Sequence, residues 1–139
     1  MSNMLLCLLA GLFFAFGCDS TPDESANREA ARKANLSPYM QQMAGPSVEA
    51  RTYLSLYTTH KVECESGEPT LRRFNCTQAK VDLAHIERAW QQALSIAEQM
   101  AQDAALSDKD RSDASGAADQ LRAGIGRIES AKSGKLPQL

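Results

Sequence analysis

The chain of 139 residues has few aromatic residues, few histidines and no excess of charge of either sign. Aromatic residues make up 6% of it, there are two histidines, and 15 basic residues against 17 acidic ones give a formal net charge of −2. A nucleic-acid partner is not expected, because phosphate backbones require a concentrated positive field. The scarcity of aromatic residues and the abundance of alanine favour helices over a β-sandwich or barrel. We therefore expect an all-α protein.

Motifs of catalysis and metal binding are also missing. Neither histidine stands in a motif with a nucleophile, and the chain has no glycine-rich phosphate loop and no paired carboxylates in an apolar setting. Asp108 to Asp119 has a weak likeness to a calcium loop, but Asp113 occupies the position where that loop needs glycine. Acidic residues at a helix start are explained by capping and the helix dipole. We expect no enzyme, no cofactor and no metal.

One long apolar run is present, at the N-terminus. Met4 to Phe16 contains 13 residues without a charge, which is the length of a signal-peptide core but too short for a membrane-spanning helix of roughly 20 residues. The run ends in Ala15-Phe16-Gly17-Cys18. This tetrapeptide resembles the lipobox of bacterial lipoprotein precursors, in which small residues precede an acylated cysteine. An ordinary cleaved signal that leaves Cys18 as a free thiol is the alternative.

The resemblance implies a signal peptide over residues 1–17 and a mature chain that begins at Cys18 with fatty acids such as palmitate attached. Two or more acyl chains anchor a protein stably to a membrane. Asp19 favours the inner membrane, facing the periplasm, and the outer membrane is the alternative. In an exported eukaryotic protein, Asn35 and Asn75 would instead be glycosylation acceptors.

Residues 18–35 are polar, with interleaved charges and little that is apolar beyond alanine. This composition predicts a lipidated flexible tether, with a solvated helix over Asp23 to Ala34 as the alternative if another element supports it. Residues 36–139 are then long enough for one helical domain.

The first part of that domain predicts a short helix and then a longer one. Ser37 is a good N-cap, Pro38 suits the first helical position, and Gly45-Pro46 predicts the end of this short helix. A second helix is expected from Ser47, with one apolar face. A strand over Arg51–Val62 is the alternative, because this stretch is rich in Tyr and Thr. The expected face consists of Ala50, Tyr53, Leu54 and Tyr57.

The strongest helical periodicity lies in the second half of the chain. One helix is expected from Thr77 to about Leu106, and another from Ser107, which forms a capping box with Asp110, to Ser133-Gly134. The two apolar stripes predict an antiparallel hairpin, against which the Ser47 helix packs to give three main helices. The first stripe is Ala79, Leu83, Ile86, Trp90, Ala93, Ala97, Met100 and Ala104, and the second is Ala114, Ala118, Leu121, Ile125 and Ile128. Small residues of the last helix, Gly124 among them, are expected to let the two backbones approach closely.

Two cysteines remain after the signal and the anchor. Cys64 and Cys76 predict a disulfide in an oxidising compartment. A zinc site that also uses His60 and His85 is the alternative, although the spacing matches no compact zinc motif.

The segment between these cysteines is turn-rich, and we expect it to be a loop that presents two arginines beside an aromatic residue. Such groups dominate many protein interfaces. The candidate partner-binding residues are Leu71, Arg72, Arg73 and Phe74, together with Tyr39 and Met43.

These expectations favour a periplasmic lipoprotein with a non-catalytic protein-binding domain, in an accessory, pilotin-like, exclusion or immunity-type role. The comparison with pilotins and immunity proteins rests on architecture alone. A carrier or sensor of a small hydrophobic ligand, held between the Pro38 helix and the apolar seam, is the alternative. Self-association through the hairpin is compatible with either function.

Overall fold

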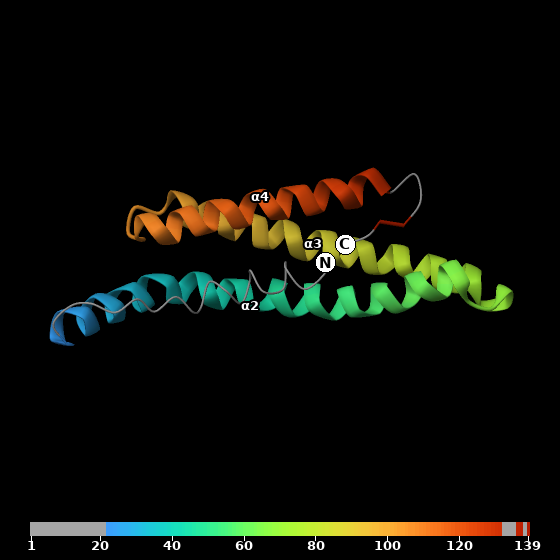
Figure 1. The fold of residues 1–139 in the computed structure, drawn as a ribbon, viewed down its shortest axis with the longest axis horizontal. Helices are drawn as coiled ribbons and strands as arrows, with labels where there is room; N and C mark the ends of the chain where they lie inside the picture. Colours follow the sequence, from blue (N-terminus) through green and yellow to red (C-terminus); the bar gives the residue numbers. More distant parts are fainter. Residues whose placement is uncertain (1–21, 132–135, 138) are drawn as a thin grey trace.

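The computed structural model describes residues 22–131, 136, 137 and 139. These residues form three helices: α2 over Pro22–Ser66, α3 over Pro69–Gln102 and α4 over Asp108–Ala131. Figure 1 shows them lying side by side along one axis, with α3 between α2 and α4. The predicted all-α fold with an antiparallel C-terminal hairpin is confirmed, and Arg51–Val62 is helical rather than a strand. The predicted signal peptide, Cys18 and Asp19 lie outside the described residues.

The core forms along α3, which packs against α2 on one side and α4 on the other. Every position of the predicted α4 stripe is buried, and so is the α3 stripe as far as Met100. Ala104 is exposed because α3 ends at Gln102. Trp90 is only 2% exposed, which confirms it as a core residue. Periodicity of apolar residues thus identified the buried faces of both helices.

α4 approaches α3 closely at Gly124. A Cβ atom at this position would lie 2.6 Å from Cζ3 of the Trp90 ring. The buried indole has little room to move, so the absence of a side chain at Gly124 is required for this packing. Gly116 lies in the same helix with open space around it.

Alanine at these two glycines should change stability in opposite directions. Gly124→Ala should lower the free energy of unfolding by about 1 to 2 kcal/mol, because the steric cost against Trp90 exceeds the gain in helix propensity. Gly116→Ala should raise it by about 0.5 to 1 kcal/mol, since it removes backbone entropy without a clash. Urea unfolding measures both, and stabilisation by both substitutions would contradict the close approach.

α2 is one continuous helix, so the predicted helix end at Gly45-Pro46 is wrong. Pro38 and Pro46 both lie inside it. An interior proline ordinarily costs about 3 kcal/mol because it removes a backbone hydrogen bond. Packing offsets this cost on both sides of Gly45-Pro46. The core has two clusters, a first that includes Trp90 and a second that includes Met100, and Met43 packs against both. Pro46 is buried, and Ala50 belongs to the first cluster. Tertiary contacts therefore override the local stop signal.

The segment before residue 36 is helical from Pro22 onward, which is the alternative expected if another element supported it. Support comes from the start of α4 and the preceding loop. The Arg32 guanidinium binds the buried Asp110 carboxylate, with Nη2 2.6 Å from Oδ1 and Nε 3.0 Å from Oδ2. Asn35 donates to the Ala105 carbonyl at 2.9 Å.

Ser107 caps α4 as predicted, because its hydroxyl accepts from the Asp110 amide at 3.1 Å.

Acid should weaken the contact between α2 and the start of α4 by protonating Asp110. Hydrogen bonds from Arg32 hold the Asp110 pKa below its usual range, and the Ser107 hydroxyl acts in the same direction while burial opposes both. Because the folded-state pKa is the lower one, the carboxylate stabilises the fold fully above about pH 4 and loses that contribution as the pH falls through the folded-state pKa. The stability gap between the parent and Asp110→Asn should therefore narrow from pH 7 to pH 3 in urea titrations. A constant gap would contradict this assignment.

α3 begins at Pro69 rather than at Thr77, so the expected long loop between the cysteines is wrong. Only Gly67 and Glu68 separate α2 from α3. Pro69 occupies the first turn, where its missing amide hydrogen has no helical partner to lose. The Thr77 hydroxyl donates within the helix to the Arg73 carbonyl at 3.0 Å instead of capping it.

Candidate functional site

The candidate site is the tip of the α2–α3 hairpin, by which we mean residues 62–81. The tip lies at the end opposite the start of α2 and extends beyond the end of α4 (Figure 1). It contains four of the six predicted partner-binding residues, now placed on the first turns of α3 rather than on a loop. They are Leu71, Arg72, Arg73 and Phe74.

The turn at the tip is short and sterically specified. The Gly67 amide donates to the Glu63 carbonyl at 3.0 Å, and a Cβ atom on Gly67 would collide with that same carbonyl oxygen. The Glu68 carbonyl then accepts from the amides of Leu71 and Arg72 at 3.0 and 2.9 Å. The turn therefore needs glycine at its first position and leads directly into α3.

The predicted disulfide between Cys64 and Cys76 is confirmed. Their Cα atoms are 4.7 Å apart, and each residue is partly buried. The bond joins the last turns of α2 to the third turn of α3. A cross-link at this point limits how far the helix ends can separate, so it fixes the relative positions of side chains on the tip.

One face of the tip carries exposed apolar side chains. Leu71 is 55% exposed and Phe74 59% exposed, and Val62 and Val81 are also exposed. Leu71 and Phe74, both predicted as partner-binding residues, are therefore open to solvent rather than folded back onto the helices. Apolar side chains held in place on a rigid element are the groups that contribute most to protein binding, because they lose little entropy on association.

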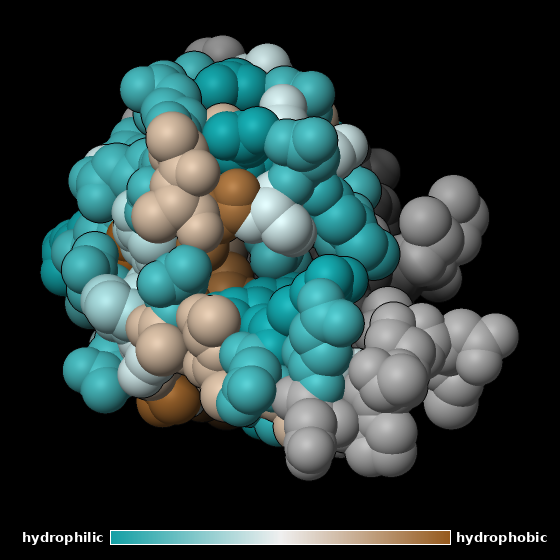
Figure 2. All heavy atoms as spheres, turned by 90° about the vertical axis from the view of Figure 1, so that its left-hand side faces the viewer, coloured by the Kyte–Doolittle hydropathy of each residue, from teal (hydrophilic) through white to brown (hydrophobic). Residues whose placement is uncertain are grey.

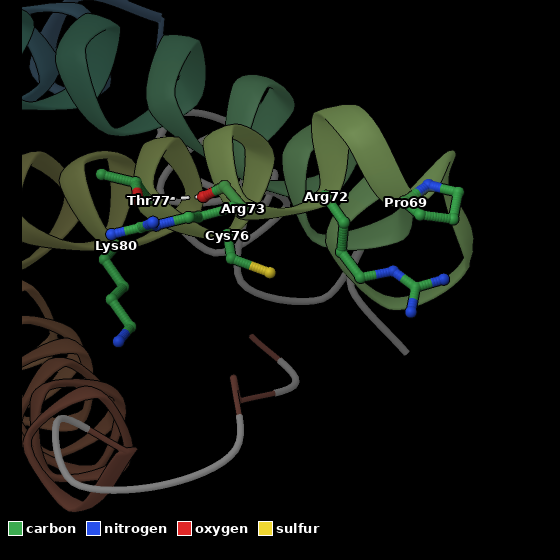
Figure 3. A pocket seen from close by; sticks show the side chains of 6 residues that line it. All are labelled: Pro69, Arg72, Arg73, Cys76, Thr77 and Lys80. Atoms are coloured by element: carbon green, nitrogen blue, oxygen red, sulfur yellow. Dashed lines mark hydrogen bonds between the residues drawn. The ribbon is translucent and has the colours of Figure 1, made fainter.

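The other face of the tip is a basic groove. It has a volume of about 480 Å³ and is lined by Pro69, Arg72, Arg73, Cys76, Thr77 and Lys80. Figure 3 shows Arg72 and Lys80 projecting from α3 to the same side, with Arg73 lying along the helix between them. Arg72 donates to the Gly67 carbonyl at 3.2 Å, and none of the three cations is in an ion pair with a described residue. The tip thus combines apolar surface with three cations that have no ion-pair partner among the described residues, and it also contains Glu63, Glu65 and Glu68.

Lys80 was missed by the sequence analysis. Its position seven residues after Arg73 places both cations on one edge of a helix. That signal was hidden because the first turns of α3 were expected to be a loop.

Tyr39 and Met43, the other two predicted partner-binding residues, lie away from the tip. Both pack against the second core cluster, which includes Ile96 and Met100. The Tyr39 hydroxyl donates to the Asp103 carboxylate at 2.7 Å. The Asp103 pKa is lowered, first by the hydrogen bond from the Ala105 amide and then by that from Tyr39. These residues hold α2 against the α3–α4 loop and are not part of the same surface as Phe74.

The four residues of the zinc alternative are not brought together. The cysteines are joined to each other, His60 Nδ1 lies 2.6 Å from an Asp82 carboxylate oxygen, and His85 stacks on Tyr53 with ring centroids 3.9 Å apart. Over residues 22–131, 136, 137 and 139, no three His, Cys, Asp or Glu side chains are grouped to hold a metal ion. The histidines instead link α2 to α3.

The opposite end of the molecule is mainly hydrophilic, with apolar side chains visible in patches (Figure 2). A groove of about 430 Å³ lies there between α2 and the start of α4, lined by Arg28, Ala31, Arg32, Asn35, Ala105, Leu106, Ser107 and Asp110. Its central charges, Arg32 and Asp110, already satisfy each other. None of the described helices is both long and apolar enough to cross a bilayer.

The chain matches no protein-family model, no curated protein and no solved structure.

Proposed function

We propose that this chain is a lipoprotein of the cell envelope, anchored through Cys18 and facing the periplasm, whose helical domain binds another protein through its tip and catalyses no reaction. Asp19 favours the inner membrane as the site of the anchor. The observation that carries the proposal is the pair of exposed apolar side chains, Leu71 and Phe74, on a tip that a disulfide clamps.

The length of α2 supports a role at a distance from the membrane. At a rise of 1.5 Å per residue, its 45 residues span about 67 Å. Three residues separate Cys18 from Pro22, so a lipid on Cys18 would lie beside the start of α2. The tip would then be carried by the far end of the same helix. An accessory role toward another envelope protein fits this geometry.

Photo-cross-linking from the tip tests the partner. With p-benzoylphenylalanine in place of Phe74, the full chain should form a specific protein adduct on irradiation in the organism from which it comes. Val48 is the matched control position, because it is 67% exposed and lies on α2 outside the tip. We expect an adduct from position 74 and none from position 48. Failure to form any protein adduct from position 74, in cells where the chain is present, would contradict the proposal.

The anchor is tested separately by Cys18→Ser. The parent should incorporate labelled palmitate and sediment with membranes, whereas the variant should do neither, because it lacks the thiol that carries the lipid. Equal sedimentation of the two proteins would contradict the anchor without bearing on the tip.

A carrier of a small hydrophobic ligand is less well supported. That alternative needs space between the Pro38 region and the apolar seam. In this region Leu36, Tyr39 and Met43 pack against Ile96, Met100, Leu106 and Ala114. Side chains that already pack on a core leave no apolar site for a ligand there.

A further inference from the structure

We infer that the basic groove of the tip binds an acidic segment of the partner protein, with carboxylates that pair with Arg72, Arg73 and Lys80. The inference rests on the proposed function and specifies the chemistry of the partner. The exposed apolar face gives no information about partner charge, whereas the groove does.

The distribution of charge along one edge of α3 is the first observation that favours an acidic partner segment. Arg73, Lys80 and Glu87 follow one another at seven-residue intervals, and Glu98 lies three turns further on, so the four residues share an edge of the helix. Where α4 covers this edge of α3, the charged residues on the edge are glutamates. Glu98 Oε1 lies 2.6 Å from Nη2 of Arg122 on α4. Beyond α4 the charge is positive and has no partner among the described residues. The pattern within the fold predicts an acidic complement for the part of this edge that α4 does not cover.

The second observation is that α4 ends before it reaches the first turns of α3. Gly124 lies opposite Trp90, and the two helices are antiparallel, so Ala131 at the end of α4 comes beside about Leu83. The first turns of α3 therefore extend past α4, and the groove occupies this extension. Seven or eight residues separate Lys80 from Arg73 and Arg72, which is about 11 Å along the helix axis. A segment with two carboxylates at that spacing would satisfy both ends of the groove.

A protein segment is favoured over an anionic lipid headgroup because of where the groove lies. It is at the far end of α2 from the proposed anchor, and Leu71 and Phe74 stand on the same rigid tip. Arginine beside exposed apolar side chains is the composition of protein-binding sites.

Cross-linking from inside the groove tests the inference. With p-benzoylphenylalanine in place of Thr77 in the full chain, mass spectrometry should identify an adduct on a partner segment that is rich in Asp and Glu. Arg72→Glu, Arg73→Glu and Lys80→Glu combined should reduce the adduct about tenfold or more, because like charges then face one another. All three side chains are exposed and none packs in the core, so α3 should remain folded in this variant, as circular dichroism would verify.

The control carries the same change of charge elsewhere. Arg51, Arg88 and Arg127 are exposed and in no ion pair with a described residue, and their combined replacement by Glu should leave the adduct within about twofold of the parent. An adduct on a neutral or basic segment, or on phospholipid, would overturn the inference. Binding of the Cys18→Ser chain to vesicles of phosphatidylglycerol and phosphatidylethanolamine that depends on the three cations would also overturn it.

Failure here is distinguishable from failure of the proposed function. If position 74 cross-links its protein equally well in the parent and in the variant with the three groove cations reversed, the protein-binding role stands and the acidic segment is excluded. If position 74 yields no protein adduct at all, the proposed function itself fails.

Discussion

Replacing Arg32 by methionine should lower the free energy of unfolding by about 3 kcal/mol. The substitution keeps most of the apolar stem but removes the guanidinium that binds Asp110. The carboxylate of Asp110 is fully buried, and in the variant its remaining partner is the Ser107 hydroxyl at 2.7 Å. A buried charge left without its counter-ion costs more than the pair contributes when intact, which makes the expected loss large. Urea unfolding followed by circular dichroism measures it.

Arg28→Met is the matched control for this prediction. Arg28 lies one turn earlier on α2 and also pairs with a carboxylate, that of Glu24 at 2.5 Å, but both side chains are largely exposed. Exposed pairs of this kind contribute little, so the control should change stability by less than about 0.5 kcal/mol. If Arg32→Met and Arg28→Met lowered the free energy of unfolding equally, the ion pair of Arg32 with the buried Asp110 would contribute no more to stability than an exposed pair.

Removing the disulfide should destabilise the fold about as much as replacing Arg32 by methionine. Combined Cys64→Ser and Cys76→Ser substitutions should lower the free energy of unfolding by about 3 kcal/mol, because the bond closes a loop between residues 12 apart and restricts the unfolded chain. The largest structural change should be at the tip, where the bond is the only covalent link between α2 and α3 besides the turn. Amide signals of residues 62–81 in NMR spectra should therefore change most.

Reduction provides an independent check on the disulfide. Dithiothreitol should lower the unfolding midpoint of the parent to that of the double serine variant and leave the variant itself unchanged. A difference below about 1 kcal/mol between parent and variant would mean that the helix packing alone holds the tip, contrary to the expected contribution of a closed loop.

The apolar pattern was sufficient to predict the parts of the fold that depend on local repetition. The faces of α3 and α4 follow from spacings of three and four residues, and Trp90 was placed in the core for that reason. The disulfide followed from counting cysteines. The cap of α4 followed from Ser107 preceding a run of helical residues.

The errors arise where distant contacts decide the structure. Gly45-Pro46 is a strong local signal for a helix end, and only packing against α3 explains why α2 continues. The helix over residues 22–35 depends on Arg32 and Asp110, 78 positions apart, a pairing that no local pattern specifies. The segment between Cys64 and Cys76 was predicted as a loop because Gly67 and Pro69 make it turn-rich, and this hid the helical spacing that joins Arg73 and Lys80 in the basic groove.

The order of the helices also bears on how the chain reaches this structure. Each helix packs mainly on the one that precedes or follows it, and such short-range topologies ordinarily fold within microseconds to milliseconds. The Arg32–Asp110 pair departs from this rule, since it joins residues 78 positions apart and links α2 directly to α4. It is therefore expected to form after the transition state, so that Arg32→Met accelerates unfolding while the refolding rate stays close to that of the parent.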